Sequence, residues 1–474
     1  MTPTLFGVLV LGLCALLLWR AGTLAMFQTV LLLSLMGGSA ALVLSGLGGS
    51  TLQPAILALA FLLVKCILPG SGGTVKFYRA VGDLAPLGIF VLYGAAGAFI
   101  LPYIFAGQIN VTPLRPIPNG YIYASFPLGF SPQNVTSAVY LLATLIAAIC
   151  GHIACQAPNA EAKVARTMSI VAMVHAFLGI SGVALAGTAW TEVLSFFRNG
   201  FYAQLDQRLD GIIRMNGIWP EPAAYAAYGF TILVFVGELW LRDVDRRWTG
   251  WAALLLGLAL LASTSTTAYV GLFAYALVIA LRILLIPGST SIRKALVLIV
   301  GGMIALAAAI SVLVVNPDLA VAFGDFFARL TTEKASSPSA LQRSFWARQG
   351  IEAFWASGGL GVGPGSFRSS SIITAVLGST GIIGFSALLF HLFRVFKPTL
   401  RSTYLELGDR RTATGAAASW AALLSLIPAS VAAATPDPGF VWGFLCGIAL
   451  ALRSSPLHQI RMHHPQLRAV DANL

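Results

Sequence analysis

Long apolar runs, separated by short polar stretches, cover most of the chain and predict its main elements. Thirteen runs are long enough to approach the thickness of a bilayer, about 30 Å. We expect each to be a helix, because a helix satisfies its own backbone polar groups in lipid. The runs lie at 5–19, 24–46, 53–68, 85–106, 133–155, 168–189, 221–241, 248–264, 266–286, 293–315, 370–395, 414–432 and 438–453. Four of them are short, so the prediction is about 12–13 transmembrane helices.

The composition excludes a soluble protein. Of the 474 residues, 57% are hydrophobic and only 10% are charged, and the mean hydropathy is +0.84. No polar linker long enough to separate domains interrupts the apolar runs. The sequence therefore predicts an all-α polytopic membrane protein with a single membrane domain over residues 1–474.

Basic residues are unevenly distributed around the predicted spans. If the N-terminus lies outside and the spans alternate, most of the 29 Lys and Arg residues fall on the inner side, as the positive-inside rule requires. The net charge of +12 is then mainly a topology signal, and no nucleic-acid partner is indicated. This orientation makes residues 454–474 a cytoplasmic tail. It leaves two long loops outside, at 190–220 and 316–368.

Nine basic residues remain outside, and all but one are arginines. They are Arg115, Arg198, Arg208, Arg214, Arg329, Lys334, Arg343, Arg348 and Arg368. Arginine binds phosphate through a planar fork and stays charged in poor solvent, so the cluster indicates an anionic partner at the outer surface. The alternative is that long loops translocate whatever their charge, and that these arginines pair with nearby acids. Those acids are Asp206, Asp210, Asp325, Glu333 and Glu352.

The long loops carry amphipathic segments. Apolar residues recur at helical spacing over 197–213 and again over 323–330, so we expect both segments to lie in the membrane interface with one face in lipid. A third outer segment, 107–132, is rich in proline and tyrosine. It could form a wall of a substrate site, but a linker is the favoured interpretation.

The first long loop runs directly into the predicted span at 221–241. Pro220 and Pro222 suit the first turn of a helix, and Glu221 would lie beside the positive end of its dipole. Gly217 permits backbone conformations closed to other residues, so the amides before this helix could accept an anion. The alternative is an ordinary helix-start loop with one stray arginine, Arg214.

The second long loop contains a helical piece at 341–348 and then a glycine-rich turn at 359–368. Glycine amides in such a turn could approach a ligand closely. The turn is not a phosphate-binding P-loop, because it lacks the Gly-Lys-Ser/Thr ending.

Several kinds of chemistry lack the residues they need. The histidines, at 152, 175, 391, 458, 463 and 464, fall at the inner ends of predicted spans or in the tail, so no histidine base is expected outside. No pattern suggests a metal or a cofactor. Few charged residues lie deep in the spans, which disfavours an ion-coupled transporter. The outer arginines then suggest an enzyme that holds a lipid-linked diphosphate as the leaving group.

Two segments resemble one known family. Arg214-x-x-Gly217-x4-Pro222 resembles the Arg-x-x-Gly…Pro-Asn stretch of the O-antigen ligase and polymerase superfamily. Arg343-x-x-Trp346, followed by Gly361-Val-Gly-Pro-Gly365, resembles its Arg-x-x-Trp…Gly-Val-Gly-x-Gly segment. Arg348-x10-Gly359 is similar to a pattern of Wzy-type polysaccharide polymerases. The hydropathy profile extends the resemblance over most of the chain.

The resemblance implies a metal-independent, inverting glycosyltransferase with a GT-C-like fold and two long periplasmic loops. It would act at the periplasmic face of the bacterial inner membrane, with undecaprenyl-diphosphate-linked glycans as donor and acceptor. Arg214 and Arg343 would bind the donor diphosphate, and Glu221 is the candidate base. The substrate-binding residues predicted in addition are Arg348, Arg208, Arg198, Arg368, Gly217, Trp346, Gly361, Gly363 and Gly365.

Two departures from the family pattern bear on the reaction. Ligases carry a His-Asn pair where this chain has Ser369, Ser370 and Ser371, and the Asn after the family's proline is Ala223. The missing histidine favours a polymerase of repeat units for an exopolysaccharide, capsule or O-antigen. The alternatives are a ligase acting on lipid A core or another acceptor and, less favoured, a glycolipid flippase. Membrane lipid and a possible chain-length-regulating co-polymerase are the further partners that the resemblance implies.

Overall fold

The computed structural model describes residues 2–47, 49–68, 73–115, 123–200, 208–209, 212–286, 291–315, 338–400 and 409–453. Within these ranges the chain is mostly helical. The helices are α1 (Leu5–Arg20), α2 (Thr23–Leu33), α3 (Pro54–Ile67), α4 (Gly73–Asp83), α5 (Ala85–Ile104), α6 (Pro132–Ala154), α7 (Ala160–Ala184), α8 (Ala189–Phe197), α9 (Pro222–Leu241), α10 (Arg246–Ala262), α11 (Thr266–Leu285), α12 (Ile292–Val315), α15 (Pro338–Ala356), α16 (Ile372–Leu400), α17 (Arg410–Leu424), α18 (Leu426–Ala432) and α19 (Phe440–Ala451). The short strands are β1 (Thr2–Pro3), β2 (Leu42–Leu44), β3 (Ser50–Leu52), β4 (Asn110–Val111), β5 (Phe126–Pro127), β6 (Arg208–Leu209) and β7 (Ile212–Ile213), and a 3-10 turn lies at Ser45–Leu47.

Seven helices in the described part of the chain are long and apolar enough to cross a membrane. They are α5, α6, α7, α9, α11, residues Ile372–Lys397 of α16, and the segment Arg410–Ala432 that combines α17 and α18. Four shorter apolar helices, α1, α2, α3 and α19, accompany them. These lengths and compositions support a helical membrane protein. Apart from 24–46, each predicted apolar run overlaps a helix, which confirms that these runs are helical. Most bounds agree within a few residues, but α7 is Ala160–Ala184 where the sequence predicts 168–189.

The predicted span at 24–46 is wrong in its second half. The helix α2 ends at Leu33, and β2 then pairs with β1 and β3 as antiparallel strands. The reason lies far along the chain, because a Cβ on Gly38 would lie only 2.7 Å from the main-chain oxygen of Ile218. The amide of Gly38 donates to that same oxygen at 2.8 Å. A contact with the segment before α9 therefore replaces helical bonding in this apolar run.

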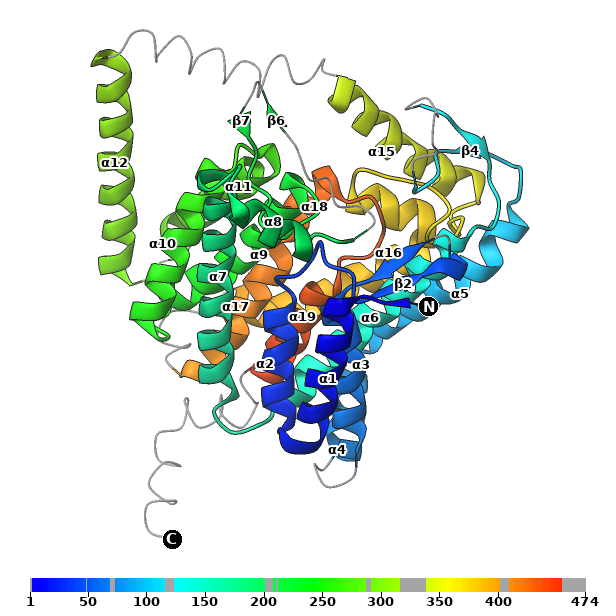
Figure 1. Cartoon of the computed structure of the whole chain (residues 1–474), viewed down its shortest axis with the longest axis horizontal. Coiled ribbons are helices and arrows are strands. Elements are labelled where there is room, and N and C mark those ends of the chain that lie inside the picture. The colour runs from blue at the N-terminus through cyan, green and yellow to red at the C-terminus, as the bar shows by residue number, and fades with distance from the viewer. Residues whose placement is uncertain are drawn as a thin grey trace.

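The helices form one bundle with α9 in its interior (Figure 1). The side chains of Tyr225, Phe230 and Phe235 on α9 are fully buried. The helices α6 and α19 pack closely at glycine positions. A Cβ on Gly443 would lie only 2.2 Å from the main-chain oxygen of Thr144, so the two backbones can approach this closely only because residue 443 is glycine. Small residues let helix backbones approach this closely where lipid gives no hydrophobic drive between helices. At the edge of the view, α12 extends away from the other helices (Figure 1), although Lys294 near its start forms an ion pair of 2.6 Å with Asp243 just after α9.

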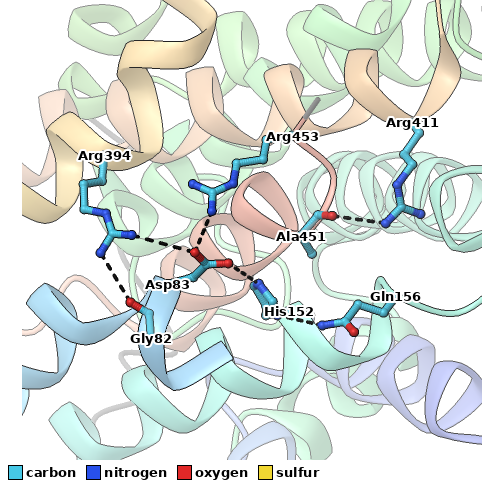
Figure 2. Close-up of polar contacts among 8 residues, drawn as sticks. All are labelled: Gly82, Asp83, His152, Gln156, Arg394, Arg411, Ala451 and Arg453. Atoms are coloured by element: carbon cyan, nitrogen blue, oxygen red, sulfur yellow. Dashed lines mark hydrogen bonds and ion pairs between the residues drawn. The ribbon is translucent and has the colours of Figure 1, made fainter. Parts of the chain in front are cut away.

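An ionic cluster at the end of α4 joins α4, α6 and α16 to Arg453, which lies just after α19 (Figure 2). The carboxylate of Asp83 contacts His152 Nε2 at 3.1 Å, Arg453 Nη2 at 2.6 Å and Arg394 Nη2 at 3.7 Å. Burial alone would raise the pKa of Asp83. The hydrogen bond with His152 and the positive charge of Arg453 outweigh that effect and lower it below the usual value. The cluster lies on the side that the basic-residue distribution assigns to the cytoplasm.

Candidate functional site at the start of α9

The loop that ends in Glu221 has the helix-start geometry that the sequence predicts. The helix α9 begins at Pro222 in its first position, with Glu221 as the residue before it. Gly217 has a φ of +52°, a left-handed conformation that favours glycine. The side chain of Glu221 is exposed and makes no capping hydrogen bond with the helix. Its carboxylate therefore stays accessible next to the loop.

Arg198 supports this loop from the end of α8. Its Nη1 donates to Oδ1 of Asn216 at 3.3 Å, and its Nε donates to the main-chain oxygen of Leu194 at 3.4 Å. The side chain is 8% exposed, so Arg198 faces protein rather than the outer surface. The hydrogen bond from Arg198 to Asn216 holds the loop that carries Arg214.

The interpretation that every histidine lies at an inner end or in the tail is wrong for His175. Its ring stacks on that of Tyr225, with centroids 4.0 Å apart, and its Nε2 lies 3.1 Å from the main-chain oxygen of Tyr225. Tyr225 belongs to the first turn of α9, so His175 lies under the loop that carries Arg214. The sequence of α7 alone does not predict this contact, because nearly every position in its apolar run is suited to packing against another helix.

Arg214 and Arg343 lie within electrostatic reach of each other, although they come from different long loops. Burial lowers the pKa of the Arg214 guanidinium. Glu221 and Tyr269 oppose that shift, whereas the positive charge of Arg343 adds to it. The two cations repel each other, and an anion between them would relieve that repulsion. Tyr269, in the first turn of α11, is a neighbour of Arg214 that sequence reasoning missed.

Arg343 is carried by α15, and the serine run after the glycine-rich turn holds that helix. Ser370 Oγ donates to the main-chain oxygen of Arg343 at 2.6 Å. One turn along α15, the guanidinium of Arg368 lies 4.4 Å from the ring centroid of Trp346. The Nε1–H of Trp346 is buried and meets no acceptor in the described residues. Buried donors are normally satisfied by protein, water or a ligand, so this N–H is a free donor beside the arginines.

The segment before residue 116 is not a free linker, contrary to the favoured interpretation. The amide of Thr112 donates to Gln349 Oε1 at 3.0 Å, and Gln349 Nε2 returns a hydrogen bond to Thr112 Oγ1 at 3.2 Å. The amide of Arg368 donates to the main-chain oxygen of Thr112 at 2.9 Å. Residues 109–114 therefore form a wall beside Trp346 and Arg368. Thr112 bonds to α15 and to the turn after it, whereas residues 109–111 pair with residues 126–128.

The glycine-rich turn packs against helices. Gly361, Gly363 and Gly365 have φ values of +84°, +92° and +88°. The amides of Gly361 and Gly363 donate to Ser357 Oγ at 2.8 Å and to the main-chain oxygen of Ser379 at 3.0 Å. These two amides are thus already bonded within the protein. In the structure, the glycines allow the close backbone contacts that place Arg368 and the serine run.

Two of the predicted site residues take no part in the contacts described above. Arg348 is exposed on α15, and Arg208 lies in β6, where the side chain is outside the described residues. Arg329 and Lys334 of the outer cluster also fall outside the described ranges. Gly217 lies in the same loop as Arg214, three residues after it.

Within the described ranges, no three His, Cys, Asp or Glu side chains gather where they could hold a metal ion. No model of a known protein family matches the chain, and no curated protein matches it. The arrangement itself offers two arginines near each other, a free indole N–H, and an exposed carboxylate. The arginines and the indole suit an anionic ligand with several oxygens, because guanidinium and indole groups donate and do not accept hydrogen bonds.

Proposed function

We propose that this protein is an inner-membrane polysaccharide polymerase. It joins undecaprenyl-diphosphate-linked repeat units at the periplasmic face, as a GT-C-like glycosyltransferase with about 12–13 transmembrane helices. The observation that carries the proposal is that the positive charge of Arg343 acts on the guanidinium of Arg214. Both belong to motifs that resemble the O-antigen ligase and polymerase superfamily, and they are far apart in the sequence.

The proposed chemistry uses the diphosphate as both handle and leaving group. The acceptor sugar hydroxyl attacks the anomeric carbon of the donor glycan, the bond from that carbon to the diphosphate oxygen breaks, and the electron pair leaves with undecaprenyl diphosphate. Inversion follows from attack on the opposite face. The hydroxyl proton passes to a base, for which the exposed carboxylate of Glu221 is the candidate.

The arginines contribute by stabilising charge. As the bond breaks, negative charge accumulates on the diphosphate, and bidentate guanidinium groups fixed in advance offset it without reorganising. Arg214 is held by a loop that Asn216 and Arg198 brace, and Arg343 by a helix that Ser370 anchors. Trp346 and Arg368 would extend the donor side of the site, since the indole N–H has no acceptor among the described residues.

The test is a reaction with purified protein in lipid nanodiscs and a native-type undecaprenyl-diphosphate repeat unit, without added metal or nucleotide. A glycan ladder on a gel is the expected result. Arg343→Ala and Arg214→Ala should each slow ladder formation by about 100-fold or more, the usual cost of losing one charge-stabilising donor. Arg247→Ala, an exposed arginine at the start of α10, is the matched control and should leave the ladder unchanged.

Lysine variants test the bidentate mechanism. Arg214→Lys and Arg343→Lys keep the charge but lose the planar fork, and full-rate polymerisation by both would show that mechanism to be wrong. A glycolipid acceptor that becomes glycosylated once, without a ladder, would identify a ligase instead. Movement of labelled lipid-linked glycan across vesicles, with no new glycosidic bond, would identify a flippase.

A further inference from the structure

Asp437 is a partly buried aspartate whose carboxylate is hydrogen-bonded within the bundle. It lies in the loop 433–439, which connects α18 to α19. Its Oδ1 accepts hydrogen bonds from Thr144 Oγ1 at 2.7 Å and from the amide of Gly439 at 3.1 Å. In the portion of the chain that the structure describes, no basic side chain forms an ion pair with it. Two neutral donors on one oxygen are all that offset its charge.

This charge costs stability at neutral pH. Burial raises the pKa of Asp437 to about 6, although the hydrogen bonds from Thr144 and Gly439 oppose the shift. An aspartate in an unfolded chain has a pKa of about 3.9, so the folded state binds the proton more tightly. The contribution of Asp437 to stability therefore falls as pH rises from about 4 to about 6. A neutral residue would be more stable there, and an ionisable group kept at such a cost is a candidate for function.

The loop of Asp437 is joined to the helix that carries Arg343. The main-chain oxygen of Ala434 accepts from the amide of Ser369 at 3.1 Å. Ser369 Oγ lies 2.9 Å from Thr374 Oγ1 at the start of α16. The next residue, Ser370, donates to the main-chain oxygen of Arg343. Two hydrogen bonds, linked by the main chain from Ser369 to Ser370, thus join the Asp437 loop to Arg343.

We propose that Asp437 is a positioning residue whose ionised form holds the loop 433–439 and, through Ser369 and Ser370, keeps Arg343 in place to bind a diphosphate. A charged acceptor makes hydrogen bonds about twice as strong as a neutral one. Protonation weakens the bonds from Thr144 and Gly439, the loop relaxes, and diphosphate affinity falls. This inference rests on the proposed function only in naming the diphosphate as the ligand.

The experiment measures two properties of purified protein between pH 5 and 8: binding of undecaprenyl diphosphate, and the thermal unfolding midpoint. The wild type should lose affinity several-fold as pH falls through about 6. Asp437→Asn, a neutral isostere, should bind weakly at every pH and yet unfold at the same or a higher temperature than the wild type at pH 7.5. Thr144→Val removes a hydrogen bond that lowers the carboxylate pKa, so it should move the midpoint of the affinity loss to higher pH.

The control is Glu192→Gln, an exposed carboxylate on α8, which should match the wild type in both measurements. An Asp437→Asn protein with wild-type affinity and pH dependence would overturn the inference and leave the proposed function standing. An Asp437→Asn protein that unfolds at a lower temperature and binds with the wild-type pH dependence would identify a purely structural cap. A wild type that binds no undecaprenyl diphosphate at any pH would refute the proposed function itself.

Discussion

Ser370 Oγ donates a hydrogen bond of 2.6 Å to the main-chain oxygen of Arg343. Ser370 stands in the run that aligns with the histidine of the ligases that the motifs resemble, and the bond reaches α15 from the far side of the glycine-rich turn. The serine run therefore places one half of the candidate arginine pair. Ser370, which stands where the family pattern has a different residue, thus has a structural role in positioning Arg343.

Ser370→Ala should weaken diphosphate binding without unfolding the protein. A hydrogen bond of this kind contributes about 1 kcal/mol net, which corresponds to an affinity loss of about fivefold. Calorimetric titration with undecaprenyl diphosphate measures it. Ser344→Ala, on the same helix with a local bond to Leu341, is the control and should bind like the wild type. Equal affinity in both variants would remove Ser370 from the set of positioning residues.

Trp346→Phe should separate stability from binding. The phenyl ring keeps the face on which Arg368 lies, but it removes an indole N–H that has no acceptor in the described part of the chain. Removing an unsatisfied buried donor is neutral or stabilising, so the unfolding midpoint should not fall. If the N–H bonds to the diphosphate, affinity should decrease by about fivefold to tenfold. An unchanged affinity would mean that the indole serves packing alone.

Gly365→Ala should destabilise the protein strongly. A Cβ there would lie 2.4 Å from the main-chain oxygen of Gln133, and the φ of +88° is strained for any side chain. We expect a loss of about 2 kcal/mol or more in the free energy of unfolding, measured by chemical denaturation in detergent. Gly257→Ala, at a helical position where the nearest contact of a Cβ would be at 3.9 Å, should cost nothing or stabilise slightly. Similar stability of the two variants would contradict the close packing described for the glycine-rich turn.

Asp83→Asn tests the ionic cluster of Figure 2. The pKa of Asp83 is lowered in the folded state, so its ionisation stabilises the protein above the unfolded pKa of about 3.9 and that stability is lost as pH falls through the folded value. At pH 7 the variant should lose about 1–3 kcal/mol, because it weakens charge-assisted bonds to His152 and Arg453. Its unfolding midpoint should also depend less on pH below about 4 than that of the wild type. A midpoint that matches the wild type at pH 7 would show that the cluster contributes no stability.

The sequence by itself determined the helical, apolar character of the chain and most helix bounds. Hydropathy is a local property, so a span such as 221–241 can be predicted without knowing which helices pack against it. Pro222 marks the helix start because of its fixed φ and missing N–H. The outer arginines were also visible in the sequence, as the charged residues that the positive-inside rule does not explain.

The tertiary structure alone decided which segments meet. It ends α2 at Leu33 because Gly38 lies against Ile218, and it places His175 beneath the Arg214 loop. It also makes 109–114 a wall and leaves Asp437 without a cationic partner in the described residues. Each of these depends on contacts between positions distant in the chain. Such contacts leave no periodic or compositional mark, so only the folded chain reveals them.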